Sequence, residues 1–145
     1  MPLAPPEPVG RSFEDRSGCQ ESIGYVIDLN PPGGGGAACV LDLRPEHLNR
    51  NGLMHGGIVA MMLDVACGYS SARWFDPENV APLLTVSLNL HYVSSVSAGR
   101  VTATGRVSGG GYKICYANGE LHDSDGKLIA TAAGVFKRIT KRPTT

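Results

Sequence analysis

Apolar and polar residues alternate along most of the C-terminal half of the chain, which is the pattern of half-buried β-strands. We expect strands over residues 85–93, 100–107, 114–122 and 128–139. The first of these alternates polar residues with an apolar set made of Val86, Leu88, Leu90 and Tyr92. Turn-forming residues separate the later segments, so we expect them to pair as neighbouring antiparallel strands.

The N-terminal third predicts one more hairpin. Residues 19–28 contain a β-rich stretch, and residues 37–43 return as a second apolar strand. Between them, two prolines and four glycines at 31–36 force a turn. Residues 45–48 can form one helical turn, and a loop with two asparagines and two glycines follows.

One long segment, from Gly57 to about Trp74, has apolar residues at helical spacing and is apolar nearly all round. A helix that is hydrophobic on every side is a buried helix. The chain thus combines five or six strands with one long helix, and the two do not alternate. This arrangement predicts an α+β fold in which an antiparallel sheet packs one face on the helix.

The chain has 145 residues, enough for one domain with one hydrophobic core. We divide it into a loose leader (1–17), a single domain (18–140) and a short basic tail (141–145). Lysine plus arginine and aspartate plus glutamate each total 13, which argues against nucleic acid or a membrane as partner. No apolar run is long enough to span a bilayer and no signal peptide is visible, so we expect a cytoplasmic protein.

The four cysteines and four histidines are scattered, without the spacing of a metal site. We therefore expect reduced, mostly buried thiols, no disulfide framework and no metal. The two glycine-rich stretches lack the Gly-Lys-Ser/Thr of a phosphate loop. The Gly-x-Ser-x-Gly turn of serine hydrolases is also missing, so serine-type hydrolysis is unsupported.

Asp64 is the single charge in the apolar stretch of the predicted helix. A buried carboxylate costs free energy unless it is paired or hydrogen-bonded, and aspartate has low helix propensity. Two interpretations stay open. Asp64 either faces solvent on a thin polar stripe with Gly57, Gly68 and Ser71, or it is a catalytic carboxylate that an apolar surrounding makes a stronger base.

The segment from Asn49 to Gly57 brings polar side chains and two glycines to the start of this helix. Free N–H groups at a helix N-terminus can bind an anion or stabilise a carbonyl oxygen that gains charge. The alternative to such a binding role is an ordinary helix start, made flexible by glycine and capped by an asparagine or histidine. Gly56 and Asp64 are eight residues apart, about 12 Å along a helix, too far to act on one carbonyl. If both serve one reaction, they come from different subunits, which predicts an obligate dimer with two composite sites.

The motif Asn49-x-x-Gly52-x-x-His55-Gly56-Gly57, followed by Asp64, resembles the hotdog-fold acyl-CoA thioesterases, most closely the PaaI-like (phenylacetate-pathway) branch. The likeness covers most of the chain and includes residues 85–92 and 125–130. It implies an antiparallel sheet wrapped around one long central helix. It also implies hydrolysis of an acyl-CoA thioester to a free carboxylic acid and CoA.

The resemblance assigns catalytic roles to five residues. Gly56 would donate its backbone N–H to the thioester oxygen, and Asp64 of the partner subunit would be the nucleophile or the general base that activates water. Asn49 would hold the attacking water or the carbonyl, and His55 would steady the loop. Thr85 occupies a position where the family often places a hydroxyl near the carboxylate. The choice between nucleophile and base is open, and Asn51 is a rival for the role of Asn49.

The resemblance also implies binding of CoA, as part of the substrate rather than as a cofactor, along the subunit interface. Candidate substrate or CoA contacts are Gly57, Arg106, Lys113, Lys137 and Arg138. For each of these basic side chains the simpler interpretation is a solvated surface charge. Expected partners are the acyl-CoA substrate and further copies of the chain, as a dimer and a dimer of dimers.

Two other functions deserve comparison. A hotdog dehydratase acting on hydroxyacyl thioesters has a different pattern around its histidine and carboxylate, and that pattern is not present here. A non-catalytic acyl-CoA-binding regulator or carrier on the same fold stays open, although it has no need for a buried base such as Asp64.

Overall fold

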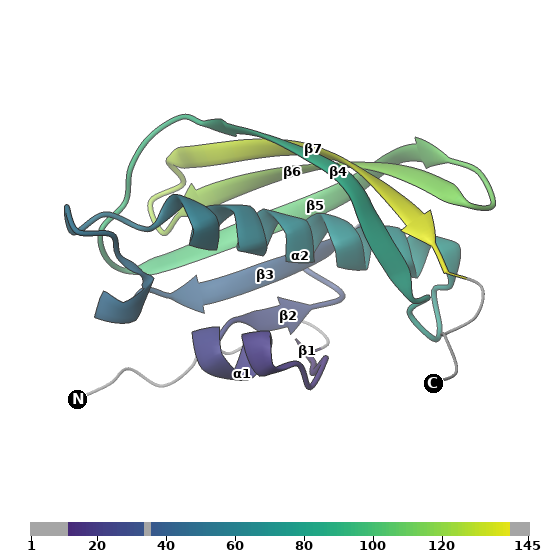
Figure 1. The fold of residues 1–145 in the computed structure, drawn as a ribbon, viewed down its shortest axis with the longest axis horizontal. Helices are drawn as coiled ribbons and strands as arrows, with labels where there is room; N and C mark the ends of the chain where they lie inside the picture. Colours follow the sequence, from purple (N-terminus) through teal and green to yellow (C-terminus); the bar gives the residue numbers. More distant parts are fainter. Residues whose placement is uncertain (1–11, 34–35, 140–145) are drawn as a thin grey trace.

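The computed structural model describes residues 12–33 and 36–139, which form one curved sheet around one long helix (Figure 1). The helices are α1 (Gly18–Ile23) and α2 (Gly56–Phe75), with a 3₁₀ turn at Pro45–His47. The strands are β1 (Ser12–Phe13), β2 (Val26–Asp28), β3 (Ala37–Asp42), β4 (Leu83–Tyr92), β5 (Arg100–Gly110), β6 (Ile114–Asp123) and β7 (Leu128–Arg138). The expected α+β fold is confirmed.

All strand pairs of the described sheet are antiparallel, in the order β1-β2-β3-β5-β6-β7-β4. Strands β2 to β7 are the six that the sequence predicts, and the two-residue β1 adds a short strand at one edge. Strand β4 forms the opposite edge of the sheet. After β4 the chain continues into β5 at the centre of the sheet, then passes through β6 to β7, which pairs beside β4. One side of β4 therefore has no neighbouring strand within the described chain.

The short helix α1 lies where the sequence predicts part of a strand over 19–28. The Ser17 hydroxyl caps the helix by accepting a hydrogen bond from the Gln20 N–H at 3.0 Å, and Gly24 ends it at φ 88°. These two caps favour a helix over an extended chain, so the strand prediction is wrong for the first half of the segment. Strand β2 keeps only Val26–Asp28 and pairs with β3 in the predicted hairpin.

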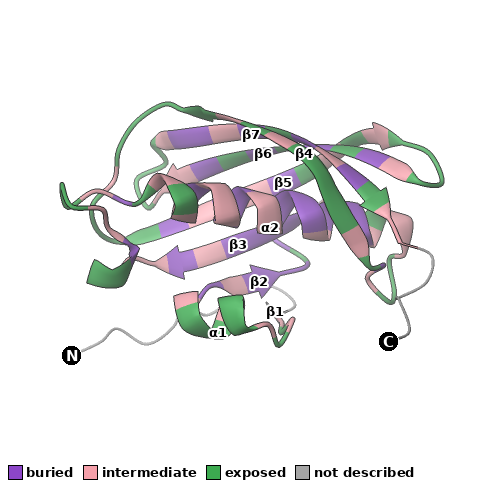
Figure 2. Cartoon of the chain, in the orientation of Figure 1, coloured by how far each residue is buried: buried purple, intermediate pink, exposed green. Residues whose placement is uncertain are grey.

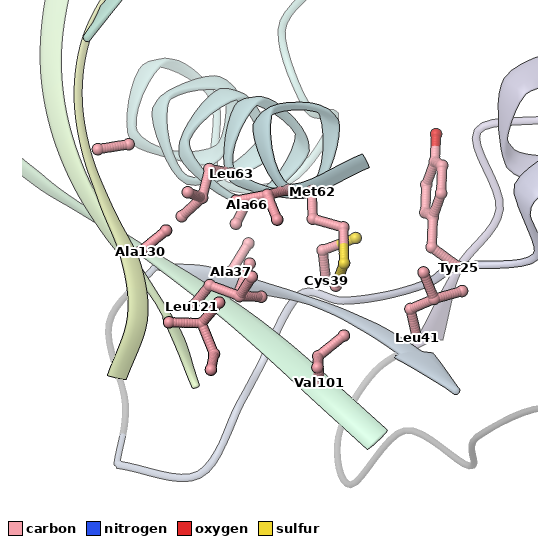
Figure 3. Packing of buried hydrophobic residues seen from close by; sticks show 14 of the residues in the cluster. Tyr25, Ala37, Cys39, Leu41, Met62, Leu63, Ala66, Val101, Leu121 and Ala130 are labelled. Atoms are coloured by element: carbon pink, nitrogen blue, oxygen red, sulfur yellow. The ribbon is translucent and has the colours of Figure 1, made fainter. Parts of the chain in front are cut away.

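The core lies between α2 and the inner face of the sheet, as Figure 3 shows. Leu63 and Ala66 of α2 pack there against Val101 of β5 and Leu121 of β6. The helix backbone rests directly on β5 at Gly105, where a Cβ would lie 2.4 Å from the Ala66 carbonyl oxygen. Glycine is required at this crossing because any side chain would push the helix off the sheet.

A β-bulge in β4 decides which of its residues face the helix. The pairing with β7 skips Val86, so the alternation of inward and outward residues shifts by one at that point. Thr85 faces Asp64 before the bulge, and Leu88 and Leu90 pack on the core beyond it. Val86 is 58% exposed, so its predicted place on the same face as Leu88 is wrong.

Strand β4 is exposed over most of its length (Figure 2). Its large exposed apolar residues, together with the one that follows it, are Leu84, Val86, Tyr92 and Val93. An exposed edge strand with apolar side chains is a template for pairing with another strand. The same is not true of β1, which is only two residues long.

The segment Phe13–Ser17 belongs to the predicted leader, yet it packs on the domain. The ring of Phe13 lies 5.1 Å from the ring of Tyr69 of α2, measured between centroids. Asp15 accepts a hydrogen bond from the Tyr25 hydroxyl at 3.2 Å and another from the Ser17 N–H at 2.8 Å. Residues 1–11 of the predicted leader and the basic tail 141–145 lie outside the described residues.

Three of the four cysteines are buried, as expected, and Cys19 is exposed. Burial raises the pKa of the Cys67 thiol from 9.0 to about 12, and the nearby Asp64 carboxylate acts in the same direction. The pKa of the Cys39 thiol is also raised by burial. No helix in the described part of the chain is long and apolar enough to cross a bilayer.

Candidate active site

Asp64 lies at the middle of α2, half-buried, and its carboxylate is held by a neighbouring strand. The Thr85 hydroxyl of β4 donates a hydrogen bond to Asp64 Oδ1 at 2.7 Å. The polar stripe of Gly57, Gly68 and Ser71 is wrong, because Gly68 and Ser71 are buried and Ser71 donates to the helix backbone, while Asp64 itself keeps part of its surface exposed. The structure therefore brings together two of the predicted site residues, Asp64 and Thr85.

A cavity of about 430 Å³ opens beside Asp64 and Thr85. Its walls come from α2, from residues 80–83 before β4, and from the segment Phe13–Arg16. The apolar part of the lining is formed by Phe13, Val65, Tyr69, Ala72, Val80, Ala81, Pro82 and Leu83. The polar part of the lining is formed by Glu14, Asp15, Arg16, Asp64 and Thr85, so the cavity presents a carboxylate beside both apolar and polar surface.

Two residues with strained backbone line the same cavity. Arg16 has φ 57° and Val80 has φ 56°, and within the described chain they are the non-glycine residues in this region of φ. For a β-branched residue such as Val80 this conformation is unfavourable. Strain of this kind persists where the surrounding structure enforces it, and it gathers at functional sites.

The loop before α2 is organised around Asn49. Its side-chain oxygen accepts hydrogen bonds from the N–H groups of Asn51 and Leu53, at 2.9 and 3.2 Å. Because both donors are backbone N–H groups, the side-chain NH₂ of Asn49 points the other way and is the group left to donate. Asn51 is exposed and contributes only its backbone N–H to this network.

His55 is the N-cap of α2. Its Nδ1 accepts a hydrogen bond from the Gly57 N–H at 2.8 Å, so in the neutral ring the proton is on Nε2. The Gly57 N–H is therefore engaged by the cap. The Gly56 N–H has no acceptor among the described residues, and as a free amide at a helix N-terminus it can donate to a carbonyl oxygen.

Tyr92 covers Gly56, and sequence reasoning did not identify this contact. The Tyr92 hydroxyl donates a hydrogen bond to the Gly56 carbonyl oxygen at 2.8 Å, and the ring lies 3.5 Å from where a Cβ would stand on Gly56. In the sequence Tyr92 is one apolar member of an alternating strand. Its approach to the helix start depends on the β4 bulge and on the path of the sheet, which no local pattern reveals.

His47, the other histidine of this region, anchors the loop rather than serving the site. It is 1% exposed; its Nδ1 accepts from the Arg44 N–H at 2.9 Å and its Nε2 lies 2.8 Å from the Ile23 carbonyl oxygen. Since the first partner is a donor, Nδ1 carries no proton and Nε2 donates. The His47 carbonyl oxygen in turn accepts from the His55 N–H at 2.8 Å, which fixes the N-cap.

Within one chain, Gly56 and Asp64 remain apart. Helix α2 is continuous from Gly56 to Phe75, so eight residues separate the two by about 12 Å along the axis. The chain on its own therefore holds the Gly56 amide and the Asp64 carboxylate in two separate places. The described residues also contain no cluster of histidine, cysteine, aspartate or glutamate that could hold a metal ion.

Of the predicted CoA contacts, three basic residues lie near one another. Lys113 comes just before the start of β6, and Lys137 pairs with Ile114 near the end of β7. The Arg138 N–H donates to the Lys113 carbonyl oxygen at 2.8 Å. The guanidinium of Arg138 lies over the rings of Phe75 and Tyr112, at 5.7 and 5.1 Å. This stacking favours a structural role for Arg138 at the end of α2.

Arg106 stands apart from that group. It pairs with Asn118 of β6, four residues beyond the strand start at Ile114, which is about 13 Å along the strand. The structure thus does not unite the four basic candidates into one surface.

The chain matches known proteins along most of its length. The model of the thioesterase superfamily matches residues 51–130, more than half of the chain. Human acyl-coenzyme A thioesterase 13 is 30% identical over 98 residues, which cover 66% of this chain and 68% of that protein.

Two solved structures share the fold. The E. coli PaaI protein of the phenylacetic acid degradation operon superposes with a TM-score of 0.75 at 21% identity, covering 90% of both chains. The BH2602 protein of Bacillus halodurans, solved with CoA, has a TM-score of 0.78 at 22% identity and covers 90% of this chain and 83% of that one. The resemblance noted in the sequence is confirmed: this chain belongs to the thioesterase superfamily and has its hotdog fold.

Proposed function

We propose that this protein hydrolyses acyl-CoA thioesters, with Asp64 as the carboxylate that attacks the thioester carbonyl or activates the water that does. The observation that carries the proposal is the Asp64 carboxylate, held by Thr85 at 2.7 Å and lining a cavity whose walls are in part aromatic and aliphatic. Membership of the thioesterase superfamily supports thioester hydrolysis as the reaction. The relative named as an acyl-coenzyme A thioesterase supports CoA as the leaving group.

The site we propose is shared between two subunits. Because about 12 Å separates Gly56 from Asp64 along α2, the amide of one subunit would act with the carboxylate of its partner. Two α2 helices that run antiparallel across a two-fold axis would form two such sites, each with the Gly56 amide of one subunit and the Asp64 carboxylate of the other. The apolar edge of β4 and the half-buried Met61 and Val65 of α2 support an interface on this side of the molecule.

The chemistry then follows from the two half-sites. The Gly56 N–H, backed by the partial positive charge of the helix N-terminus, polarises the thioester carbonyl and stabilises the oxygen as it gains charge. If Asp64 acts as a base, it takes a proton from water while a C–O bond forms at the carbonyl carbon. The C–S bond then breaks and the proton passes to the departing thiolate, giving the carboxylic acid and CoA. If Asp64 is the nucleophile, water instead cleaves an acyl-aspartate intermediate.

We assign the acyl group to the cavity beside Asp64. Its lining combines aromatic and aliphatic side chains with the polar Glu14, Asp15 and Arg16, and at about 430 Å³ it has room for a group bulkier than acetyl. The CoA portion would leave toward the partner subunit, where the His55 ring caps the helix start that carries the polarising amide. Contacts of CoA with Arg106, Lys113, Lys137 or Arg138 stay a prediction.

The test is the Asp64→Asn variant, measured against a panel of acyl-CoA substrates with detection of the released thiol. We expect wild-type protein to release CoA from at least one bulky acyl-CoA and the variant to lose nearly all turnover. Circular dichroism and the oligomeric state of the variant control for folding. Turnover near the wild-type rate in Asp64→Asn would exclude Asp64 as the catalytic group. Tight acyl-CoA binding by wild-type protein without CoA release would instead identify a non-catalytic binding protein.

A further inference from the structure

The segment Phe13–Arg16, which we call the partition, separates two cavities. One is the cavity of about 430 Å³ beside Asp64, and the other, of about 530 Å³, lies against α1 and the residues that follow it. Three side chains of the partition, Phe13, Glu14 and Arg16, line both cavities, and the other lining residues are not shared. A displacement of this segment would therefore more than double the space that opens beside Asp64.

The strand pairing that holds the partition is short. Strand β1 has two residues, and its register with β2 covers only Ser12 and Phe13. The chain then turns at Arg16, which has φ 57°, a conformation that residues other than glycine rarely adopt. A segment with so little sheet pairing separates easily from the domain unless side chains fix it.

Asp15 fixes the partition to α1 and to the chain just after it. The Tyr25 hydroxyl donates to Asp15 Oδ2 at 3.2 Å and the Ser17 N–H donates to Asp15 Oδ1 at 2.8 Å, so both carboxylate oxygens are engaged. Gln20 of α1 binds the same stretch, since its Oε1 accepts from the Asp15 N–H at 2.9 Å and its Nε2 donates to the Phe13 carbonyl oxygen at 3.4 Å. Hydrogen bonds to an ionised acceptor are the stronger kind, so the carboxylate is the main tie.

The partition also meets α2, at Tyr69. The ring of Phe13 lies 5.1 Å from the ring of Tyr69, with 58° between the two planes. Burial raises the pKa of Tyr69, and the charge of Asp15 and a hydrogen bond to its carboxylate act in the same direction. One tyrosine thus meets the partition with its ring and its hydroxyl, on the helix that carries Asp64.

We propose that Asp15 is a positioning residue of the acyl site: it keeps the partition in place and thereby confines the acyl group to the cavity beside Asp64. The inference rests on the proposed binding of acyl-CoA at Asp64. When the tie through Asp15 is lost, the partition moves and the two cavities join. Longer acyl chains then gain apolar surface to bury, on Tyr25 and Val26 for example, whereas a two-carbon group gains nothing.

Calorimetric binding of S-ethyl-CoA and S-dodecyl-CoA, two thioethers that cannot be hydrolysed, tests the proposal. Asp15→Ala should raise the preference for the dodecyl compound over the ethyl compound by at least about tenfold. Tyr25→Phe removes one tie from a residue that lines only the second cavity, so it should shift the preference in the same direction by less. Asp15→Asn should restore the wild-type preference, because its amide oxygen can accept from the Ser17 N–H while its NH₂ donates to the Tyr25 hydroxyl oxygen.

Two further measurements show whether Asp15 acts through the partition. In the double variant Phe13→Ala/Asp15→Ala, the change in preference should fall short of the product of the two single effects, because both substitutions open the same wall. Hydrogen–deuterium exchange, measured with no CoA compound present, should be faster at residues 12–17 in Asp15→Ala and unchanged in α2.

The matched control is Asp123→Ala, which removes a half-buried carboxylate that accepts from two backbone N–H groups at 2.8 and 3.0 Å but lines neither cavity. It should leave the preference and the exchange of residues 12–17 unchanged, and a shift as large as that of Asp15→Ala would overturn the proposal. An unchanged preference or unchanged exchange in Asp15→Ala overturns it too, as does wild-type protein that binds neither thioether. Binding of both thioethers with the expected shift, but no CoA release from acyl-CoA, would reject hydrolysis and still support the role of Asp15.

Discussion

The hydroxyl of Thr85 donates a hydrogen bond to Asp64 Oδ1 at 2.7 Å, across the gap between β4 and α2. This bond fixes the rotamer of the carboxylate and leaves Oδ2 without a partner among the described residues. It depends on the β4 bulge, which turns Thr85 inward while the residues beyond it still face the core.

Removing the Thr85 hydroxyl should lower catalysis without removing it. A hydrogen bond to a charged group contributes about 1.5–3 kcal/mol, so Thr85→Val should reduce kcat/KM by roughly tenfold to a hundredfold. Thr85→Ser keeps the donor and should retain most of the activity. Steady-state kinetics on one acyl-CoA compares the two variants. Equal activity of Thr85→Val and wild-type protein would show that this bond does not orient the reacting carboxylate.

Tyr92 should act as a positioning residue for the Gly56 amide. Tyr92→Phe keeps the ring that covers Gly56 and removes only the 2.8 Å hydrogen bond to its carbonyl oxygen. The loss of a neutral hydrogen bond of about 1 kcal/mol should lower kcat by roughly fivefold, with little change in KM. A change confined to KM would assign Tyr92 to substrate binding instead.

The segment before α1 should set which acyl groups are accepted. Phe13→Ala enlarges the cavity beside Asp64, so the ratio of kcat/KM for a long acyl-CoA to that for acetyl-CoA should rise by about tenfold. Tyr116→Ala is the control, because Tyr116 is an aromatic residue 51% exposed on β6 and outside this cavity. Parallel changes in both variants, or a uniform loss over all substrates in Phe13→Ala, would contradict the assignment of the acyl group to this cavity.

The contact of α2 with β5 should tolerate no side chain at Gly105. A Cβ there would lie 2.4 Å from the Ala66 carbonyl oxygen, and the atoms in its way are backbone. Gly105→Ala should therefore lower the free energy of unfolding by about 3 kcal/mol. Gly109→Ala, on the same strand with no atom within 4 Å of the added Cβ, should change it by less than about 1 kcal/mol. Chemical denaturation of both variants measures the difference.

Stability should decline in alkaline solution. Burial raises the pKa of the Cys67 thiol from 9.0 to about 12, so the folded state prefers the neutral thiol. The stabilisation is complete below pH 9 and is lost as pH rises from 9 toward 12. Burial raises the pKa of Tyr25 and Tyr69 in the same direction, which adds to the decline.

Thermal unfolding followed across this pH range checks the expectation. The Tm should change little just below pH 9 and fall above it. Cys67→Ala should make the fall shallower, whereas Cys19→Ala, which removes an exposed thiol, should leave it unchanged. A Tm that stays constant well above pH 9 would mean that these buried groups do not titrate differently in the folded and unfolded chains.

Local patterns predicted most elements but not the α1 segment. The four C-terminal strands and the long helix were predicted to within a few residues, because their side-chain periodicity directly reflects which face is buried. The helix α1 was missed, because the β-forming residues 25–27 drew attention away from the caps at Ser17 and Gly24 just before them. The motif around His55 and Asp64 was sufficient to identify the family, since it lies in one continuous stretch.

The sequence alone determined the class of fold and the family, and it predicted Asp64 as the candidate carboxylate, because all three depend on short-range patterns. Only the tertiary structure placed Tyr92 on Gly56 and brought Phe13 to Tyr69 and to the cavity beside Asp64. These contacts join residues that are distant along the chain. They depend on the β4 bulge, on the order of the strands and on the packing of α2 against Gly105. Packing across the whole domain, rather than the neighbouring residues in the sequence, decides all three.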